Sequence, residues 1–138
     1  MGTRSITHVH EMKSLGEDKI VCSFYRHFDG YPTGHGKDLA DWLKGKRLVN
    51  GIGSDFKADR DHNRAGQMAI ELMHSLKQET SIECLPTGVS DYGEEFVYHV
   101  YFDNEFLIEC IPSYSGKTFK GKAADFDGEK IESELYEE

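Results

Sequence analysis

The 138-residue sequence has few cysteines and prolines, three of each, and it contains no long apolar run. Cys22, Cys84 and Cys110 are odd in number and widely spaced, with no Cys-x-x-Cys pair. This spacing excludes zinc-finger and thioredoxin-like motifs. Each cysteine lies in an apolar, strand-like run, so we interpret all three as buried thiols in a reducing compartment.

Targeting signals and basic clusters are also missing. The polar N-terminus has no apolar stretch typical of a signal peptide, and no run approaches the roughly 20 apolar residues of a membrane span. We therefore expect a soluble, cytoplasmic protein with no membrane partner. The net charge is −9 and Lys and Arg are not clustered, so we expect no direct binding to duplex nucleic acid.

The acidic charge is concentrated at the C-terminus. Residues 125–138 contain seven acidic residues against Lys130, which gives −6 and leaves −3 for residues 1–124. Terminal runs of like charge are usually solvated. We therefore predict a single domain over 1–124 followed by an acidic, solvated tail over 125–138.

The first half of the chain predicts two strands and then two helices. Alternating apolar residues predict strands at 5–11 and 19–28, which we expect to pair as a hairpin. Leu39, Trp42 and Leu43 have the spacing of a buried helical stripe. A second helix is predicted up to Lys77, with Asp61 as its N-cap and a loop over 49–59 before it.

Strands return in the second half of the chain. They are predicted at 81–85, at 95–102, at 106–111 and, more weakly, at 118–126. An Asp-Asn turn joins the middle two strands as a hairpin. The order ββααβββ(β) predicts an α+β fold, in which a largely antiparallel sheet of five to six strands packs against two helices.

Polar residues gather at the end of the second predicted strand. Tyr25, His27 and Asp29 would share one face there, and such a group could hold a general base with its orienting acid. These three residues are the catalytic candidates. The same residues could equally form a structural hydrogen-bond cluster that locks the following turn, and both interpretations stay open.

The glycine-rich turn that follows suggests an anion site. Gly34, Gly36 and Lys37 precede a predicted helix, where free backbone N–H groups attract anions. It is not a P-loop, because five residues rather than four separate Gly30 from the Gly-Lys pair, and Asp38 replaces the Ser or Thr that binds magnesium. A simple tight turn is the alternative interpretation.

Histidines suggest a metal hypothesis. His8 and His10 point the same way on a strand, and a hairpin could bring His27 and Asp29 near them. Imidazoles with a carboxylate would suit zinc or iron. We predict no cofactor, with a divalent metal at these residues as the alternative.

Two segments together resemble a known family. Met1-Gly2-Thr3-Arg4-Ser5 and Tyr25-Arg26-His27-Phe28-Asp29-Gly30-Tyr31-Pro32, with Gly36 after it, are similar to motifs of a family of small tailed-phage and prophage proteins. That family opens with x-Thr-Arg-Ser, followed by Tyr-x-His-aromatic-Asp-Gly-Tyr-Pro. The resemblance covers about the first 40 residues and implies a phage setting. Its hallmark positions are Thr3, Arg4, His27, Asp29 and Tyr31, and it supplies no catalytic role for any of them.

These observations favour a phage accessory binding protein over an enzyme. By analogy with other small phage proteins, it would sequester or occlude host machinery, for example as an inhibitor of CRISPR or nucleotide-signal immunity. Its partner would be a host protein or a small anionic ligand. The ligand-binding candidates are Thr3, Arg4, Arg26, Tyr31, Gly34, Gly36 and Lys37. The alternatives are a small hydrolase or metal-assisted phosphodiesterase using His27 and Asp29, and a structural or virion-associated module that forms homo-oligomers.

Overall fold

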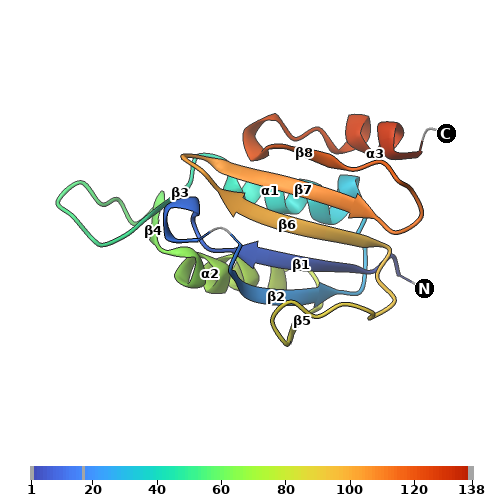
Figure 1. The fold of residues 1–138 in the computed structure, drawn as a ribbon, viewed down its shortest axis with the longest axis horizontal. Coiled ribbons are helices and arrows are strands. Elements are labelled where there is room, and N and C mark those ends of the chain that lie inside the picture. The colour runs from blue at the N-terminus through green and yellow to red at the C-terminus, as the bar shows by residue number, and fades with distance from the viewer. Residues whose placement is uncertain (1, 17, 137–138) are drawn as a thin grey trace.

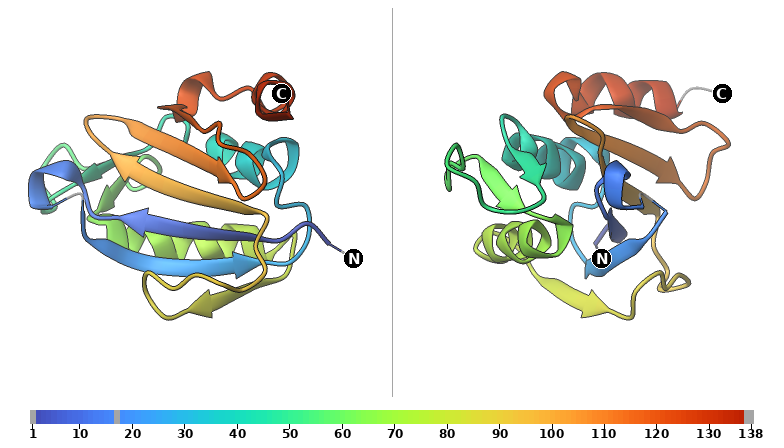
Figure 2. Two further views of the ribbon diagram at one scale, coloured as in Figure 1. Left: turned by 45° about the vertical axis from the view of Figure 1, so that its right-hand side comes forward. Right: turned by 60° about the vertical axis from the view of Figure 1, so that its left-hand side comes forward.

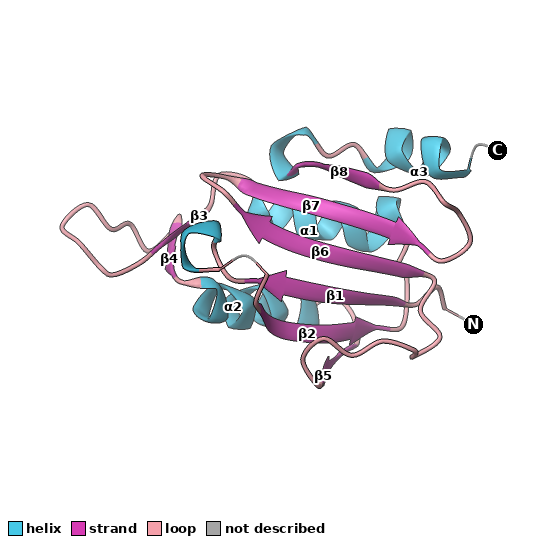
Figure 3. Ribbon diagram, viewed as in Figure 1, coloured by secondary structure: helices cyan, strands magenta, loops and turns pink. Residues whose placement is uncertain are grey.

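A computed structural model describes residues 2–16 and 18–136, so the last two residues of the predicted tail lie outside it. The chain forms a six-stranded sheet in the order β5-β2-β1-β6-β7-β8 (Figures 1 and 3). The strands are β1 (Ser5–His10), β2 (Ile20–Arg26), β5 (Ile82–Leu85), β6 (Phe96–Phe102), β7 (Phe106–Pro112) and β8 (Phe119–Lys122). Within this six-stranded sheet β1–β6 is the one parallel pair among the described strands, which confirms the predicted α+β fold with a largely antiparallel sheet.

Both predicted hairpins form. β1 and β2 pair with Ile6 opposite Tyr25, and the register shifts between Val9 and His10. β6 and β7 pair through a tight turn that brings Phe102 opposite Phe106. The central pairing of β1 with β6 was not predicted, because it joins segments about 90 residues apart that no local turn connects.

Two helices cover one face of the sheet, α1 (Lys37–Leu43) and α2 (Ala65–Lys77), as the views in Figures 1 and 2 agree. The predicted helical stripes face the sheet, with Trp42 and Met73 half-buried and their other members buried. They contribute Leu39 and Leu43 from α1, and Ala65, Ala69, Leu72 and Leu76 from α2. These side chains pack against Val9 and Phe24 of the sheet in one core. No helix in the described ranges is long and apolar enough to span a membrane.

The start of α2 differs from the prediction. Asp61 is not its N-cap but belongs to β4 (Asp61–Asn63), which pairs in parallel with β3 (Arg47–Val49). Its buried carboxylate accepts hydrogen bonds from Arg47 Nε at 2.7 Å and Arg60 Nε at 2.8 Å, and these bonds hold its pKa well below the usual value. The first N–H of α2, from Ala65, instead donates to Glu11 Oε1 at 3.3 Å. The cap therefore comes from a residue distant in sequence.

The predicted solvated tail is also wrong over most of its length. A 3₁₀ turn follows β8, and Gly128–Tyr136 form helix α3, which lies beside β8 at the edge of the sheet in both views of Figure 2. Ile131 and Leu135, spaced i and i+4, are each only 3% exposed and join the core with Phe126. The tail was predicted to be solvated from its charge alone, and that prediction did not use the helical spacing of Ile131 and Leu135.

The packing of α3 generates a stability prediction. Leu135→Ala should reduce the free energy of unfolding by roughly 2–5 kcal/mol, because it leaves a cavity beneath the helix. Urea unfolding followed by circular dichroism measures this change. Glu134→Ala, at an exposed position of the same helix, is the control and should change the stability by less than about 0.5 kcal/mol. Equal, small effects of both substitutions would indicate that α3 does not contribute to the fold.

Candidate functional site

The two segments that carry the family resemblance touch each other at the end of β2. Gly30 N–H donates to the Thr3 carbonyl at 2.8 Å, and the Gly30 carbonyl accepts from the buried Tyr98 hydroxyl at 2.7 Å. A Cβ on Gly30 would lie 2.8 Å from the Thr3 oxygen, so only glycine fits there. The preceding residue, Asp29, adopts a left-handed φ of 60°, which turns the chain away from the strand direction.

A buried polar network holds this turn from inside. Arg26, only 4% exposed, donates from Nε to the Phe28 carbonyl at 2.6 Å and from Nη1 to Asp38 Oδ2 at 2.7 Å. Nη1 also lies 3.2 Å from Nδ1 of His35, which is fully buried and whose Nε2 lies 2.6 Å from Thr7 Oγ1. Because arginine can only donate, Nδ1 accepts and Nε2 carries the proton that is donated to Thr7. Arg26 thus has a structural role here.

The expected base–acid pair of His27 and Asp29 is replaced by two separate hydrogen bonds. His27 Nδ1 lies 2.7 Å from the Tyr25 hydroxyl, and Asp29 Oδ1 accepts from the Tyr31 hydroxyl at 2.9 Å. The left-handed turn at Asp29 is the reason, since it breaks the alternation on which the shared face depended.

Four rings gather on the surface at this end of the sheet, and we call them the aromatic patch: Tyr25, His27, Phe28 and Tyr92. Ring centroids are 5.9 Å apart for Tyr25–His27, 4.7 Å for His27–Phe28 and 6.3 Å for Tyr25–Tyr92. Phe28 is 49% and Tyr92 43% exposed. The sequence did not predict that Tyr92 lies beside Tyr25, because the loop between β5 and β6 brings together residues that are distant in the chain.

Arg4 lies at the edge of the aromatic patch. A Cβ on Gly93 would be 2.5 Å from Arg4 Nη1, so the side chain passes directly over the loop that carries Tyr92. Arg4 Nε is buried and has no hydrogen-bond partner among the described residues. Its backbone carbonyl accepts from Glu95 N–H at 2.9 Å, which ties the loop to the start of β1.

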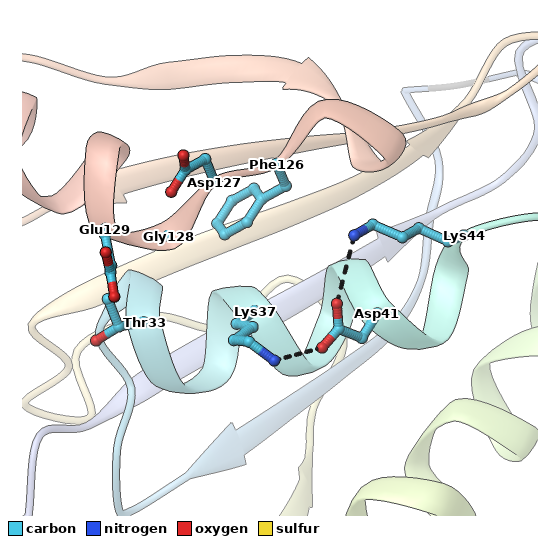
Figure 4. Close-up of a pocket in the computed structure, with 8 residues that line it drawn as sticks. All are labelled: Thr33, Lys37, Asp41, Lys44, Phe126, Asp127, Gly128 and Glu129. Atoms are coloured by element: carbon cyan, nitrogen blue, oxygen red, sulfur yellow. Dashed lines mark hydrogen bonds and ion pairs between the residues drawn. The ribbon is translucent and has the colours of Figure 1, made fainter.

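The predicted anion site does not present free positive charge. Gly34 N–H and Gly36 N–H both bond within the turn to the Tyr31 carbonyl, at 2.9 and 3.4 Å. Lys37 Nζ pairs with Asp41 Oδ2 at 2.7 Å. A cavity of about 410 Å³ does adjoin Lys37, between α1 and the start of α3 (Figure 4). Its lining is mixed in charge: Lys37, Lys44, Asp41, Asp127 and Glu129.

Histidines line the open face of the sheet, opposite the helices. His8 and His10 share this face, as predicted, but their third neighbour is His99 of β6. His10 Nε2 lies 2.7 Å from His99 Nδ1, while His8 Nδ1 lies 2.7 Å from Ser23 Oγ. His27 is at the opposite end of β1, next to the pairing of Arg26 with Ser5. Burial and the neighbouring His10, His8 and Lys120 lower the pKa of His99 to about 4.

No cluster of three or more His, Cys, Asp or Glu side chains in the described ranges is placed to hold a metal ion. The comparisons with known proteins add no assignment. No family model matches the chain, and neither a curated protein nor a solved structure is significantly similar to it. The geometry of the chain itself therefore carries the functional interpretation.

The buried imidazole of His35 predicts a pH dependence of stability. Burial and the Arg26 charge lower its pKa to about 3 in the folded protein, from 6.5. The unfolded chain therefore binds one more proton between these values, and stability falls as the pH drops below about 6.5, by up to about 1.4 kcal/mol per pH unit from this group.

His35→Gln keeps a donor and an acceptor for Thr7 and Arg26 and removes the titration. Urea unfolding between pH 6.5 and 4 should show a shallower decline for this variant than for the unmodified protein. His74→Gln, at an exposed position of α2, should decline as the unmodified protein does. Parallel curves for all three proteins would contradict the assignment to His35.

Proposed function

We propose that this chain is a binding protein that docks on a partner protein through the aromatic patch. The observation that carries the proposal is the pair of half-exposed rings, Phe28 and Tyr92, set around Tyr25 and His27. Exposed aromatic rings bury large apolar area on association, and aromatic residues are enriched among those that dominate binding energy.

The aromatic patch is held in place before any partner binds. Arg26 fixes the Phe28 carbonyl, and His35 N–H donates to the Asp29 carbonyl at 2.7 Å. Backbone order on both sides of Phe28 lowers the conformational entropy that association must remove, so more of the contact energy appears as affinity.

Charged groups at the rim give the aromatic patch a means of selecting its partner. Arg4 lies against Gly93, next to Tyr92, while the exposed Asp29 follows Phe28, and the two side chains carry opposite charge. Charges at an interface rim contribute mainly to orientation and to the rate of association. A protein surface with an apolar centre and a complementary charged border fits this arrangement better than a small anion does.

The resemblance to tailed-phage proteins supports a bacterial host protein as the partner, with sequestration or occlusion as the mode of action. A component of host immunity is the finer form of this proposal. The hydrolase alternative receives less support, since its two named residues, His27 and Asp29, hydrogen-bond to different tyrosines.

The test compares the double variant Phe28→Ala/Tyr92→Ala with the unmodified protein and with Ile52→Ala. Ile52 is 70% exposed in the loop between β3 and β4, so it controls for the loss of exposed apolar area elsewhere. Quantitative affinity purification from bacterial lysate identifies the partner, and calorimetry with that purified partner measures affinity. The double variant should bind at least about 30-fold more weakly, and Ile52→Ala within about threefold of the unmodified protein.

Sedimentation of the protein alone provides the second measurement. A monomer that acquires a specific partner supports the proposal. Symmetric oligomers that the double variant dissociates, with no partner recovered, would instead assign the aromatic patch to self-assembly. Undiminished partner binding by the double variant would exclude the patch as the docking surface.

A further inference from the structure

Three sulfur atoms converge between the sheet and α2, and none of them belongs to the aromatic patch. Cys22 of β2 and Cys84 of β5 both point toward α2, where the Met73 side chain lies between them. Met73 Sδ is 3.9 Å from Cys22 Sγ and 4.0 Å from Cys84 Sγ.

The two separations from Met73 Sδ to the cysteine sulfur atoms, 3.9 and 4.0 Å, match the spacing of sulfur ligands around one metal ion. Three sulfur atoms about 2.3 Å from an ion in a trigonal arrangement lie about 4.0 Å from one another. Thiolate and thioether ligands together select soft ions such as Cu(I) over harder divalent ions. We propose that Cys22, Met73 and Cys84 form a binding site for a soft monovalent cation of the Cu(I) class.

The strand register favours an ion over a direct disulfide bond. Cys84 is directly opposite Phe24, so Cys22 and Cys84 are diagonal neighbours on adjacent antiparallel strands. Such neighbours have Cα atoms about 7–8 Å apart, whereas disulfides usually require 4.4–6.8 Å. The third sulfur, from Met73, would have no role in a disulfide.

A groove beside the three sulfur atoms would let an ion reach them from solvent, and its apolar side chains would shield the bound ion from water. A groove of about 280 Å³ opens over Cys84 and is also lined by Ile70, Ile82, His74 and Lys77. The prediction that all three cysteines are buried holds for Cys110 but is wrong for the other two, since Cys84 is exposed and Cys22 is half-buried. An ion can therefore enter from the surface and bind in an apolar setting. Lys77 and His74 also line the groove, so the Lys77 charge offsets part of the negative charge of two thiolates and His74 adds an imidazole.

Cu(I) binds thiolates, so the thiol protons of Cys22 and Cys84 are released when the ion binds. Binding of a soft ion replaces the thiol protons, and apparent affinity should therefore rise with pH.

The experiment is a Cu(I) titration of the reduced protein under anaerobic conditions, in competition with bicinchoninate. We expect one ion per chain. Cys84→Ser should weaken binding at least about 100-fold and Met73→Leu at least about tenfold, because each removes one sulfur ligand. Cys110→Ala is the control, because Cys110 is buried in the core and does not line the groove. The affinity of this variant for Cu(I) should lie within about threefold of that of the unmodified protein.

Three results would overturn the proposal. They are uptake that Cys84→Ser leaves unchanged, affinity that Met73→Leu leaves unchanged, and a Cys22–Cys84 disulfide in a protein that takes up no Cu(I) when reduced. Circular dichroism of each variant confirms folding before titration. The Phe28→Ala/Tyr92→Ala variant should bind Cu(I) normally, so this test is independent of the proposed protein docking.

Discussion

A guanidinium that is only 4% exposed must find its hydrogen-bond partners inside the protein, and Arg26 finds them on three separate segments. It reaches the Phe28 carbonyl, the His35 imidazole and the Asp38 carboxylate, and His35 continues the network to Thr7 on β1. The end of β2, the glycine-rich turn, α1 and the centre of the sheet are thereby joined.

The network explains why a motif rich in functional residue types serves mainly as a scaffold. The inward-facing residues of the motif hydrogen-bond or pack tightly inside the protein, as Gly36 does against the Phe126 ring. Its outward-facing members, Phe28 above all, are displayed on a backbone that cannot easily rearrange. Exposed rings on an ordered backbone are suited to recognition, because less conformational entropy is lost when a partner binds.

The two faces and the edge of the sheet have different chemistry. Helices seal one face with an apolar core, while the open face carries the histidines around His99 and, at one end, the aromatic patch. The sulfur atoms of Cys22 and Cys84 lie where α2 meets the edge strand β5. These three regions share no residue.

Local patterns in the sequence were enough to predict the six strands of the main sheet, its two hairpins and most of the buried stripes of α1 and α2, but not the short strands β3 and β4. Alternation and helical spacing report which side of an element is apolar, and a tight turn reports which neighbour it pairs with. They do not report which distant element covers that side. The apolar spacing of Ile131 and Leu135 could have revealed α3, but the surrounding acidic charge concealed it.

Only the tertiary structure decided the partners that are remote in sequence. The parallel pairing of β1 with β6 set His99 beside His8, the loop after β5 set Tyr92 beside Tyr25, and packing of α2 on β2 and β5 brought Met73 to two thiols. The physical reason is the same in each case. A sequence encodes the preference of each segment for burial and geometry locally, whereas the choice among distant partners is made by the total packing of the chain.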